Sequence, residues 1–377
     1  MDVAVVHPFL YTRGGAERVV LEVAKEFDAK VFCSRFVPEE TFPEFKDVDV
    51  EVVKSHASLL LPGFLPVRVR DAVSAGMKFF NKKLDGFDVV NAQGTPAEWI
   101  RNRNRPVVWY CHTPNREAFD LYQWRMSRRQ LHQKALYWSM IQPYRIIESM
   151  IVPKIEHIFA NSVNTQKRIK NFLGRDSEVL NPGVDCNSFR CEGFEKFFFY
   201  PSRITPEKRF EYAIAAFKEF KKENKGWRLV IAGALVKERH EHVAYYHKIK
   251  RMLGSDGDIL LDVPNKKLVD LFSRCYSVLY SPVNEDFGII PLEAMASGKP
   301  CIAVNEGGPK EVVLNNKTGF LVDSEADMAR KMSLIASNPD KAERMGRAGR
   351  RLARSKYSWK AFMKRFRVRL REACKRS

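Results

Sequence analysis

The sequence lacks long hydrophobic runs and any residues typical of a secretory leader. No apolar stretch reaches the roughly 18 uncharged residues of a membrane-spanning helix, so we expect any membrane contact to be peripheral. The first residues, Met1–Pro8, have neither a basic start nor a long apolar core. We therefore expect a β-strand there and not a signal peptide.

Paired cysteines are also missing. The seven cysteines are an odd number, and none of them forms a CxxC pair. Cys186 and Cys191 are the only close pair, with four residues between them. This pattern is typical of reduced thiols and has no zinc-binding spacing, so we expect a cytoplasmic protein without a metal site.

Acidic residues are too few to balance the basic ones. The chain has 64 Lys and Arg against 45 Asp and Glu, a formal net charge of +19. Residues 341–377 hold 15 of these cations against two glutamates, and residues 101–150 hold nine against three acidic residues. Such charge attracts polyanions: nucleic acid, an anionic membrane surface or phosphorylated small molecules.

The length and the hydrophobic pattern indicate two α/β domains. With 377 residues, 45% of them hydrophobic, the chain is long enough for two soluble domains and is neither disordered nor disulfide-stapled. Short apolar runs alternate with amphipathic segments, which is typical of βαβ units and parallel sheets. The series restarts near residues 183–195, so we place the domains at 1–182 and 183–357. The expected strands lie at 2–6, 30–33, 48–53, 87–92, 106–111, 158–160, 197–200, 229–233, 259–261, 278–280 and 301–304.

The most informative segment, residues 281–300, combines a loop with the start of a helix. Pro291 suits the first turn of a helix, where its missing N–H group is not needed. Backbone N–H groups from Gly288 to Ile290 would then precede the helix, an arrangement that binds phosphate. Glu285 and Glu293 flank the loop and are suited to accept hydrogen bonds from ribose and sugar hydroxyls, although a glutamate in a first helical turn is also common.

This run closely resembles the signature of the retaining glycosyltransferase family 4, which has the GT-B fold. The resemblance spans nearly the whole chain and is weakest between residues 35 and 105. It implies two Rossmann-like, doubly wound parallel-sheet domains that face a central cleft. The other segments that agree in order and spacing are 14–18, 160–162, 181–185, 202–209, 307–313 and 318–322.

The resemblance implies a role for each matching residue. Arg203 and Lys208 match the basic pair that grips the donor diphosphate, and two fixed cations would stabilise a leaving nucleotide. Glu293 matches the carboxylate that holds the ribose, and Glu285 the one that contacts the transferred sugar. His112 matches a histidine beside the donor sugar that reaches the acceptor side. The donor-binding set also includes Gly14, Gly15, Phe287, Gly288, Ile289 and Ile290.

Two further details refine the resemblance. The segment Tyr110–Pro114, which contains His112, resembles a subgroup rich in mannosyltransferases, so GDP-mannose is the leading donor. The chain departs from the family at Arg209, where glycine is frequent. It departs again at Ala234–Val236, where a Gly-Asp-Gly run is frequent.

We therefore predict a retaining hexosyltransferase that moves mannose from GDP-mannose to a saccharide or a polyprenyl-linked acceptor. The resemblance implies that the departing phosphate helps to deprotonate the acceptor and that fixed cations replace a metal, so neither metal nor cofactor is expected. A C-terminal helix at about 358–374 is expected to pack back on the first domain, as in other GT-B proteins. The alternatives are a UDP-sugar donor, a sugar-nucleotide epimerase, an inactive glycosyltransferase-like subunit and a nucleic-acid-binding protein, although no nucleic-acid module is visible.

A basic, aromatic stretch suggests where a membrane would be met. It runs from Trp124 through Trp138 to Arg145. We interpret it as a segment that docks on the anionic inner face of a membrane. The alternative is an ordinary amphipathic helix packed on the first domain.

Overall fold

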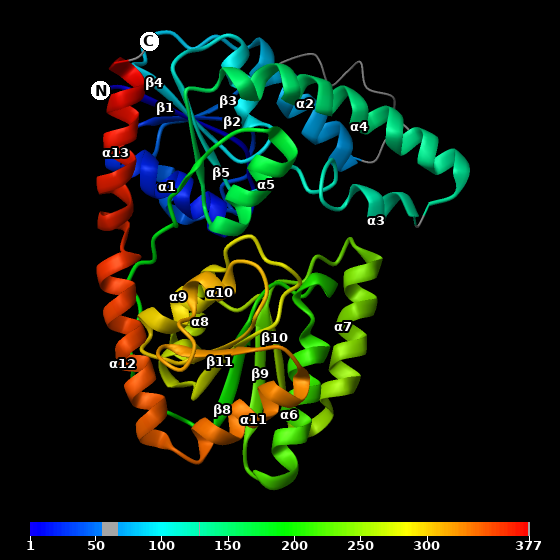
Figure 1. Ribbon diagram of the computed structural model, residues 1–377, viewed down its shortest axis with the longest axis vertical. Helices are drawn as coiled ribbons and strands as arrows, with labels where there is room; N and C mark the ends of the chain where they lie inside the picture. Colours follow the sequence, from blue (N-terminus) through cyan, green and yellow to red (C-terminus); the bar gives the residue numbers. More distant parts are fainter. Residues whose placement is uncertain (55–66, 128, 376–377) are drawn as a thin grey trace. The chain divides into compact units, whose positions relative to one another are not determined.

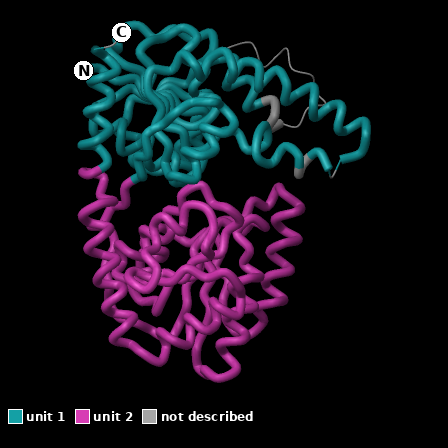
Figure 2. The backbone as a smooth tube through the Cα atoms, in the orientation of Figure 1, with its two compact units in different colours: residues 1–182, 362–377 teal, residues 183–361 magenta. Residues whose placement is uncertain are grey.

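The chain folds into two compact units (Figure 2). Unit 1 comprises residues 1–182 and 362–377, and unit 2 comprises residues 183–361. The computed structural model describes residues 1–54, 67–127 and 129–375, without the side chains of 67–70, 124 and 125.

Unit 1 is built on a parallel sheet with the strand order β3-β2-β1-β4-β5-β6-β7. The residue pairs Val6–Phe32 and Val6–Ala92 show that β1 is hydrogen-bonded on both sides. Strands β1, β4 and β5 are buried almost throughout, because both faces of a parallel sheet are covered by helices. The strands are β1 Val3–Leu10, β2 Lys30–Phe36, β3 Val50–Val52, β4 Val89–Gln93, β5 Val107–Cys111, β6 His157–Ala160 and β7 Glu178–Val179.

Helices connect these parallel strands, as their geometry requires (Figure 1). Ser162 caps the helix after β6: its hydroxyl accepts a hydrogen bond from the Thr165 N–H at 2.9 Å. Gly174 ends the same helix in the left-handed conformation. The helices are α1 Gly15–Phe27, α2 Val67–Asn81, α3 Tyr122–Ser127, α4 Leu131–Ile151 and α5 Val163–Leu173, with 3₁₀ turns that include η1 Pro43–Asp47, η3 Ala97–Asn102 and η4 Val152–Lys154.

The last helix, α13 (Trp359–Lys375), contributes its residues from Phe362 onward to unit 1. Phe362 and Phe366 lie against the ring of Tyr110 in β5, with ring centres 5.5 and 6.5 Å away. Arg365 and Arg369 of the same helix form ion pairs with Glu178. The C-terminal segment therefore supplies part of the core of unit 1 and not only its surface.

Unit 2 contains a second parallel sheet, with the order β10-β9-β8-β11-β12-β13. The predicted α/β class, with two Rossmann-like parallel sheets, is confirmed. The strands are β8 Phe197–Pro201, β9 Arg228–Gly233, β10 Gly257–Leu261, β11 Ser277–Tyr280, β12 Cys301–Val304 and β13 Gly319–Val322. The helices are α6 Phe210–Glu223, α7 His240–Leu253, α8 Asn265–Arg274, α9 Ile289–Ala296, α10 Pro309–Val312, α11 Glu325–Ala336 and α12 Pro339–Lys356, with 3₁₀ turns η5 Pro206–Lys208 and η6 Gly254–Asp256.

In both sheets the chain starts in the middle and then builds outward in two directions. In unit 1 this reversal lies between β1 and β4, and in unit 2 between β8 and β11. Loops that leave neighbouring strands at such a point diverge and leave a crevice outside the carboxyl ends, where ligands bind in open α/β sheets. The topology alone therefore singles out the loops after β1, β4, β8 and β11.

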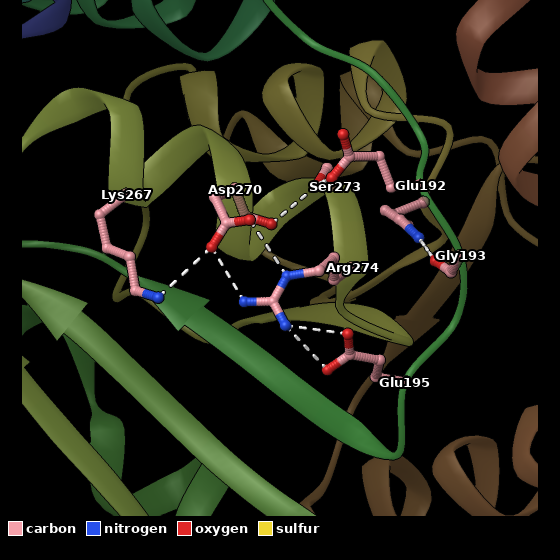
Figure 3. A network of polar contacts seen from close by, with 8 residues as sticks. Glu192, Gly193, Glu195, Lys267, Asp270, Ser273 and Arg274 are labelled. Carbon is pink, nitrogen blue, oxygen red and sulfur yellow. Dashed lines mark hydrogen bonds and ion pairs between the residues drawn. The ribbon is translucent and has the colours of Figure 1, made fainter.

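Within unit 2, the segment just before β8 is attached to α8 by a polar network (Figure 3). Arg274 donates to both carboxylate oxygens of Glu195, at 2.9 and 3.1 Å, and also bonds Asp270 on its own helix. The Ser273 hydroxyl donates to Glu192 at 2.9 Å. These contacts fix the path of the chain just before β8.

A buried pair of carboxyl groups joins α4 to the 3₁₀ turn η3. Glu98 is fully buried and Glu148 is 2% exposed. The Trp99 indole N–H donates to Glu148 Oε1 at 2.6 Å. Burial, together with the neighbouring Glu148 carboxylate, raises the pKa of Glu98 well above its usual range. Burial also raises the pKa of Glu148, so the protonated form is favoured in this pair and most strongly at Glu98.

Replacing Glu98 by glutamine should change how the stability of the protein depends on pH. A carboxyl whose pKa is raised by folding stabilises the folded state at low pH and loses that contribution as pH rises above about 4.5, its usual value. The permanently neutral Glu98→Gln variant should therefore gain melting temperature over the wild type increasingly between pH 5 and pH 8. Thermal melts across this range measure the difference. Glu40→Gln, at an exposed carboxylate, is the control and should show no such trend.

Candidate functional site

The loop after β8 carries the two predicted donor-binding cations. Arg203 lies exposed two residues beyond the strand, and Lys208 ends the 3₁₀ turn η5. The hydroxyl of Tyr200, fully buried in β8, donates to the backbone carbonyl of Lys208 and accepts from the Ser281 N–H at 3.0 Å. One tyrosine thus joins the loop after β8 to the loop after β11.

Glu285 lies in the loop after β11 and pairs with Lys208. The Lys208 ammonium donates to Glu285 Oε2, and both side chains are largely buried. Burial alone would raise the pKa of Glu285, but the charge and hydrogen bond of Lys208, helped by Tyr280 and Arg203, hold it below its usual value. The structure therefore brings three of the predicted residues together: Arg203, Lys208 and an ionised Glu285.

Two glycines hold the Glu285 loop by close backbone contact. Gly308 donates its N–H to the Glu285 carbonyl at 2.8 Å. Gly307 has a φ of +55°, and a Cβ there would lie 2.4 Å from the Glu285 carbonyl oxygen. Larger residues cannot approach this closely. The physical role of the predicted Gly307–Gly308 segment is therefore to support the loop that carries Glu285.

Arg209, the first departure from the family pattern, has a clear structural role. It adopts a left-handed conformation with φ +47°, which explains why glycine is frequent at this position. Its guanidinium donates to the carbonyls of Ser281 and Pro282, at 2.8 and 3.0 Å, and to Glu306 at 2.9 Å. Arg209 therefore adopts an unfavourable backbone conformation, and the hydrogen bonds of its guanidinium stabilise the loop after β11.

Ala234–Val236, the second departure from the family pattern, begins beside the loop that carries Arg203. A Cβ on Gly233 would lie 1.7 Å from the Ser202 carbonyl oxygen, so the end of β9 packs directly on the loop after β8. Ile204 donates its N–H to the Ala234 carbonyl at 2.9 Å. The backbone of Ala234 therefore supports the segment that carries Arg203.

Helix α9 begins directly after Gly288, as predicted from the sequence. Gly288 precedes it in the left-handed region, with φ +85°, and the first helical residue is Ile289. Phe287 and Ile290 are buried, at 4% and 9% exposure, whereas Glu293 is half-buried. The N–H groups at the start of α9 and the Glu293 carboxylate thus belong to the same helix, next to the Glu285 loop.

In unit 1, His112 directly follows β5. Its Nε2 atom is buried and has no hydrogen-bond partner among the residues that the structure describes. Burial, with a contribution from His7, lowers the pKa of His112 to about 3. His112 is therefore a neutral imidazole, and its buried ring nitrogen still has hydrogen-bonding capacity.

Two residues near His112 escaped the sequence analysis. His7, in β1, places Nδ1 3.0 Å from the Gln93 carbonyl oxygen and Nε2 3.9 Å from Glu17 Oε1. The Thr12 hydroxyl donates to the same Glu17 oxygen at 2.7 Å. Burial would raise the pKa of Glu17, but His7 and Thr12 hold it below its usual value. The pair lies at the reversal point of the unit 1 sheet.

The predicted glycine loop of unit 1 has two distinct positions. A Cβ at Gly14 would lie 2.5 Å from Glu17 Oε2, whereas a Cβ at Gly15 would meet no atom within 4 Å. Gly14 therefore makes room for the Glu17 carboxylate, and Gly15 leaves an open space above the start of α1. Glu17 is visible in the sequence as part of the Gly-Gly-Ala-Glu run. Its contacts with Gly14 and His7, however, can be seen only in the fold.

Other kinds of site were searched over the described residues. Within them, no group of three His, Cys, Asp or Glu side chains could hold a metal ion, and no helix is long and apolar enough to cross a membrane. Among the described residues, the cysteines form no disulfide.

Comparisons with known proteins agree with this geometry. Residues 13–188 match the family described as Glycosyltransferase Family 4, and residues 189–352 match the family described as Glycosyl transferases group 1. Two parallel Rossmann-like sheets, each with a site at its reversal point, together with these matches, define a GT-B glycosyltransferase. The chain belongs to glycosyltransferase family 4 and is a hexosyltransferase.

Relatives extend over almost the whole chain. The human protein "Alpha-1,3/1,6-mannosyltransferase ALG2" is 28% identical, over 96% of this chain and 93% of its own length. Its counterpart in Dictyostelium discoideum is 25% identical over 96% of both chains.

Solved structures share the fold at lower identity. Anabaena Alr3699/HepE in complex with UDP and glucose has a TM-score of 0.74 at 19% identity, over 99% of this chain and all of that one. Sucrose-phosphate synthase from Thermosynechococcus elongatus has a TM-score of 0.76 at 15% identity, over all of both chains.

Removing Lys208 should destabilise unit 2 even without substrate. Lys208→Met leaves Glu285 largely buried without its main counter-charge, which costs about 3 kcal/mol when a buried ion pair is broken. Because the depressed pKa of Glu285 stabilises the fold above about 4.5, the loss should be full at pH 7 and shrink as pH falls. Chemical denaturation at pH 7 and at about pH 4.5 measures this loss of stability. The exposed Lys237→Met serves as control, and an equal loss in both variants would contradict the role of the pair.

Alanine at the two adjacent glycines should have opposite consequences. Gly14→Ala pushes the new methyl group into the Glu17 carboxylate, so the melting temperature should fall as the Glu17–Thr12 contact is lost. Gly15→Ala adds a methyl group in open space at the first position of a helix, so the melting temperature should be unchanged or slightly higher. Parallel melts test this contrast, and the reverse order would contradict it.

Proposed function

We propose that the protein is a retaining mannosyltransferase that uses GDP-mannose and transfers mannose to a saccharide or polyprenyl-linked acceptor. The observation that carries the proposal is similarity to mannosyltransferases over 96% of the chain. The cluster of Arg203, Lys208 and Glu285 at the reversal point of unit 2 supports it, because this cluster combines cations for a diphosphate with a carboxylate for sugar hydroxyls.

Unit 2 would hold the donor. Arg203 and the N–H groups of Gly288–Ile290 would bind the diphosphate, since a cation and a helix N-terminus both favour anions. Lys208 would shift from Glu285 toward the phosphate as negative charge develops there. Glu293 would accept hydrogen bonds from the ribose, and Glu285 from the mannose hydroxyls. Phe287, a buried residue of the same loop, would keep these groups at fixed separations.

The bond from the anomeric carbon to the phosphate oxygen breaks as the acceptor oxygen attacks from the same face. The sugar becomes oxocarbenium-like, as in glycosyl transfer generally. The leaving diphosphate gains negative charge, which Arg203 and Lys208 stabilise by fixed positive charge. The departing phosphate oxygen takes the acceptor proton. We propose that these cations serve in place of a metal ion and that no cofactor takes part.

Unit 1 would bind the acceptor. His112 is neutral at physiological pH, so its buried Nε2 can exchange a hydrogen bond with a sugar hydroxyl without carrying a competing positive charge. Gly15 leaves the backbone at the start of α1 open to a ligand group, and Gly14 makes room for the Glu17 carboxylate. In this proposal Glu17 and His7 position the glycine loop.

A ligand panel tests the donor. Thermal melts of the wild type with GDP, GDP-mannose, UDP and UDP-sugars, at fixed moderate salt, should show a shift with the guanosine ligands alone. A ligand at a hundred times its Kd stabilises the folded state by about 2.7 kcal/mol. Glu293→Ala should abolish the shift because the ribose loses its carboxylate partner. Glu223→Ala, at an exposed residue of α6, should retain it.

The remaining outcomes separate the alternatives. A shift with UDP ligands alone would keep the transferase and overturn the donor. Turnover of the sugar nucleotide into an epimer without an acceptor would indicate an epimerase. No shift with any ligand would favour an inactive subunit, and steep salt-dependent binding to a nucleic-acid duplex would favour a nucleic-acid-binding protein.

A further inference from the structure

Three buried polar atoms at one edge of the unit 1 sheet have no hydrogen-bond partner among the residues that the structure describes. They are Oε1 of Gln93, Nε2 of His112 and Oδ1 of Asn161. Gln93 ends β4, His112 directly follows β5, and Asn161 directly follows β6. Buried polar side-chain atoms are normally hydrogen-bonded, so three unpartnered ones on adjacent strands need a physical explanation. We call these three side chains the polar row.

The polar row lies on one face of the sheet, at the carboxyl ends of its strands. Gln93 is paired with Tyr110 in β5, and the rings of Tyr110 and His112 lie against each other with centres 5.0 Å apart. The Asn161 N–H donates to the Cys111 carbonyl at 3.4 Å, which continues the ladder between β5 and β6 and brings Asn161 level with His112. Side chains two residues apart in a strand share a face, as do those of paired residues on neighbouring strands.

A relay of amide groups determines which atom of Gln93 is left without a partner. The Asn91 Nδ2 group donates to the Val108 carbonyl at 3.0 Å. Because a backbone carbonyl can only accept, Asn91 presents its Oδ1 atom to Gln93, whose Nε2 group donates to it at 2.8 Å. The remaining atom of this fully buried side chain, Oε1, can therefore only accept a hydrogen bond.

The other two members of the polar row are held in place through their backbones. The His112 carbonyl accepts from the Thr165 hydroxyl at 3.3 Å, and the Asn161 carbonyl accepts from Asn181 Nδ2 at 3.0 Å. Burial lowers the pKa of His112 to about 3, so its ring carries no charge at neutral pH. The row is thus fixed in position and electrically neutral.

The chemistry of the polar row selects a neutral ligand with several hydroxyl groups. The amide oxygens of Gln93 and Asn161 can only accept, so they need a ligand that donates hydrogen bonds. A fully ionised phosphate has no donor to offer them. Strands β4, β5 and β6 together span about 10 Å, which is farther than the hydrogen bonds of one water molecule reach. A sugar ring offers donors in several directions and can reach along this edge.

We propose that Gln93, His112 and Asn161 form a binding site for the hydroxyl groups of one sugar ring. Gln93 and Asn161 accept hydrogen bonds from two hydroxyls, and His112 exchanges one with a third. The inference rests on the proposed function, from which it takes the sugar-nucleotide donor and the saccharide acceptor. The ring belongs to the donor or to the acceptor, and the experiment distinguishes these two sources.

Affinity measurements with and without a sugar test the site. Kd values for GDP, GDP-mannose, UDP and UDP-glucose are measured in the wild type, Gln93→Met and Asn161→Leu. If the ring is the donor's, each variant should raise the Kd of the sugar nucleotide about threefold to tenfold, the factor that a neutral hydrogen bond contributes. The Kd of the nucleotide alone should not change. Asn171→Leu, at an exposed residue of α5, is the matched control and should bind both ligands like the wild type.

Free glycosides test the acceptor as the source of the ring. Binding of the methyl glycosides of mannose, glucose and N-acetylglucosamine is measured by saturation-transfer NMR, with and without GDP. If the ring is the acceptor's, Gln93→Met and Asn161→Leu should raise the glycoside Kd about threefold to tenfold and leave the sugar-nucleotide Kd unchanged. Unchanged affinity for both kinds of ligand in both variants would overturn the proposal, because the row would then hold only water.

Thermal melts separate a loss of binding from a loss of folding. Gln93→Met removes one hydrogen bond to Asn91 together with one unpartnered oxygen, so the melting temperature should change little. The backbone hydrogen bond of Asn161 is retained in Asn161→Leu. If one variant melts clearly below the wild type, the affinities measured with the other variant decide.

The two proposals can fail independently. If GDP-mannose binds and neither variant weakens any sugar ligand, the polar-row inference fails and the proposed function stands. If UDP-glucose alone binds and the variants weaken it relative to UDP, the row stands and the proposed donor fails. If no nucleotide binds the wild type, the proposed function fails and the glycosides decide: binding that the variants weaken supports the row, and no binding overturns it.

Discussion

The ion pair between Lys208 and Glu285 is the contact on which the unit 2 site depends. It joins two loops whose residues are 77 positions apart in the chain, across the point where the sheet changes direction. Tyr200, Arg209, Gly307 and Gly308 all act on the same two loops and keep them in register. Any anion that attracts Lys208 therefore competes with Glu285 for its ammonium group, so the charge state of one loop affects the other.

Much of the fold could be read from the sequence because parallel strands are continuous apolar runs. Val107–Cys111 and Phe197–Pro201 are such runs, and both form central strands. The loop before α9 was predictable because Gly288 and Pro291 act locally, through backbone conformation and a missing N–H group. The cap at Ser162 followed from the same local chemistry.

What could not be predicted depends on contacts between distant residues. The pairing of Glu98 with Glu148 and the placement of Glu17 beside His7 arise only when separate elements meet. The orientation of α4 could not be predicted from the sequence for a different reason. Hydrophobic periodicity normally indicates which side of a helix is buried, and here Tyr137, Arg145 and Glu148 anchor the polar side instead.

The position of α13 has a consequence for the folding of the chain during its synthesis. Phe362 and Phe366 complete the aromatic packing around Tyr110 in the first unit, yet they follow all of unit 2 in the chain. While a ribosome is still producing unit 2, the preceding 182 residues have an exposed apolar surface where this helix will lie. Domains usually fold in order as they emerge. Here the first unit is completed only after the second has been synthesised.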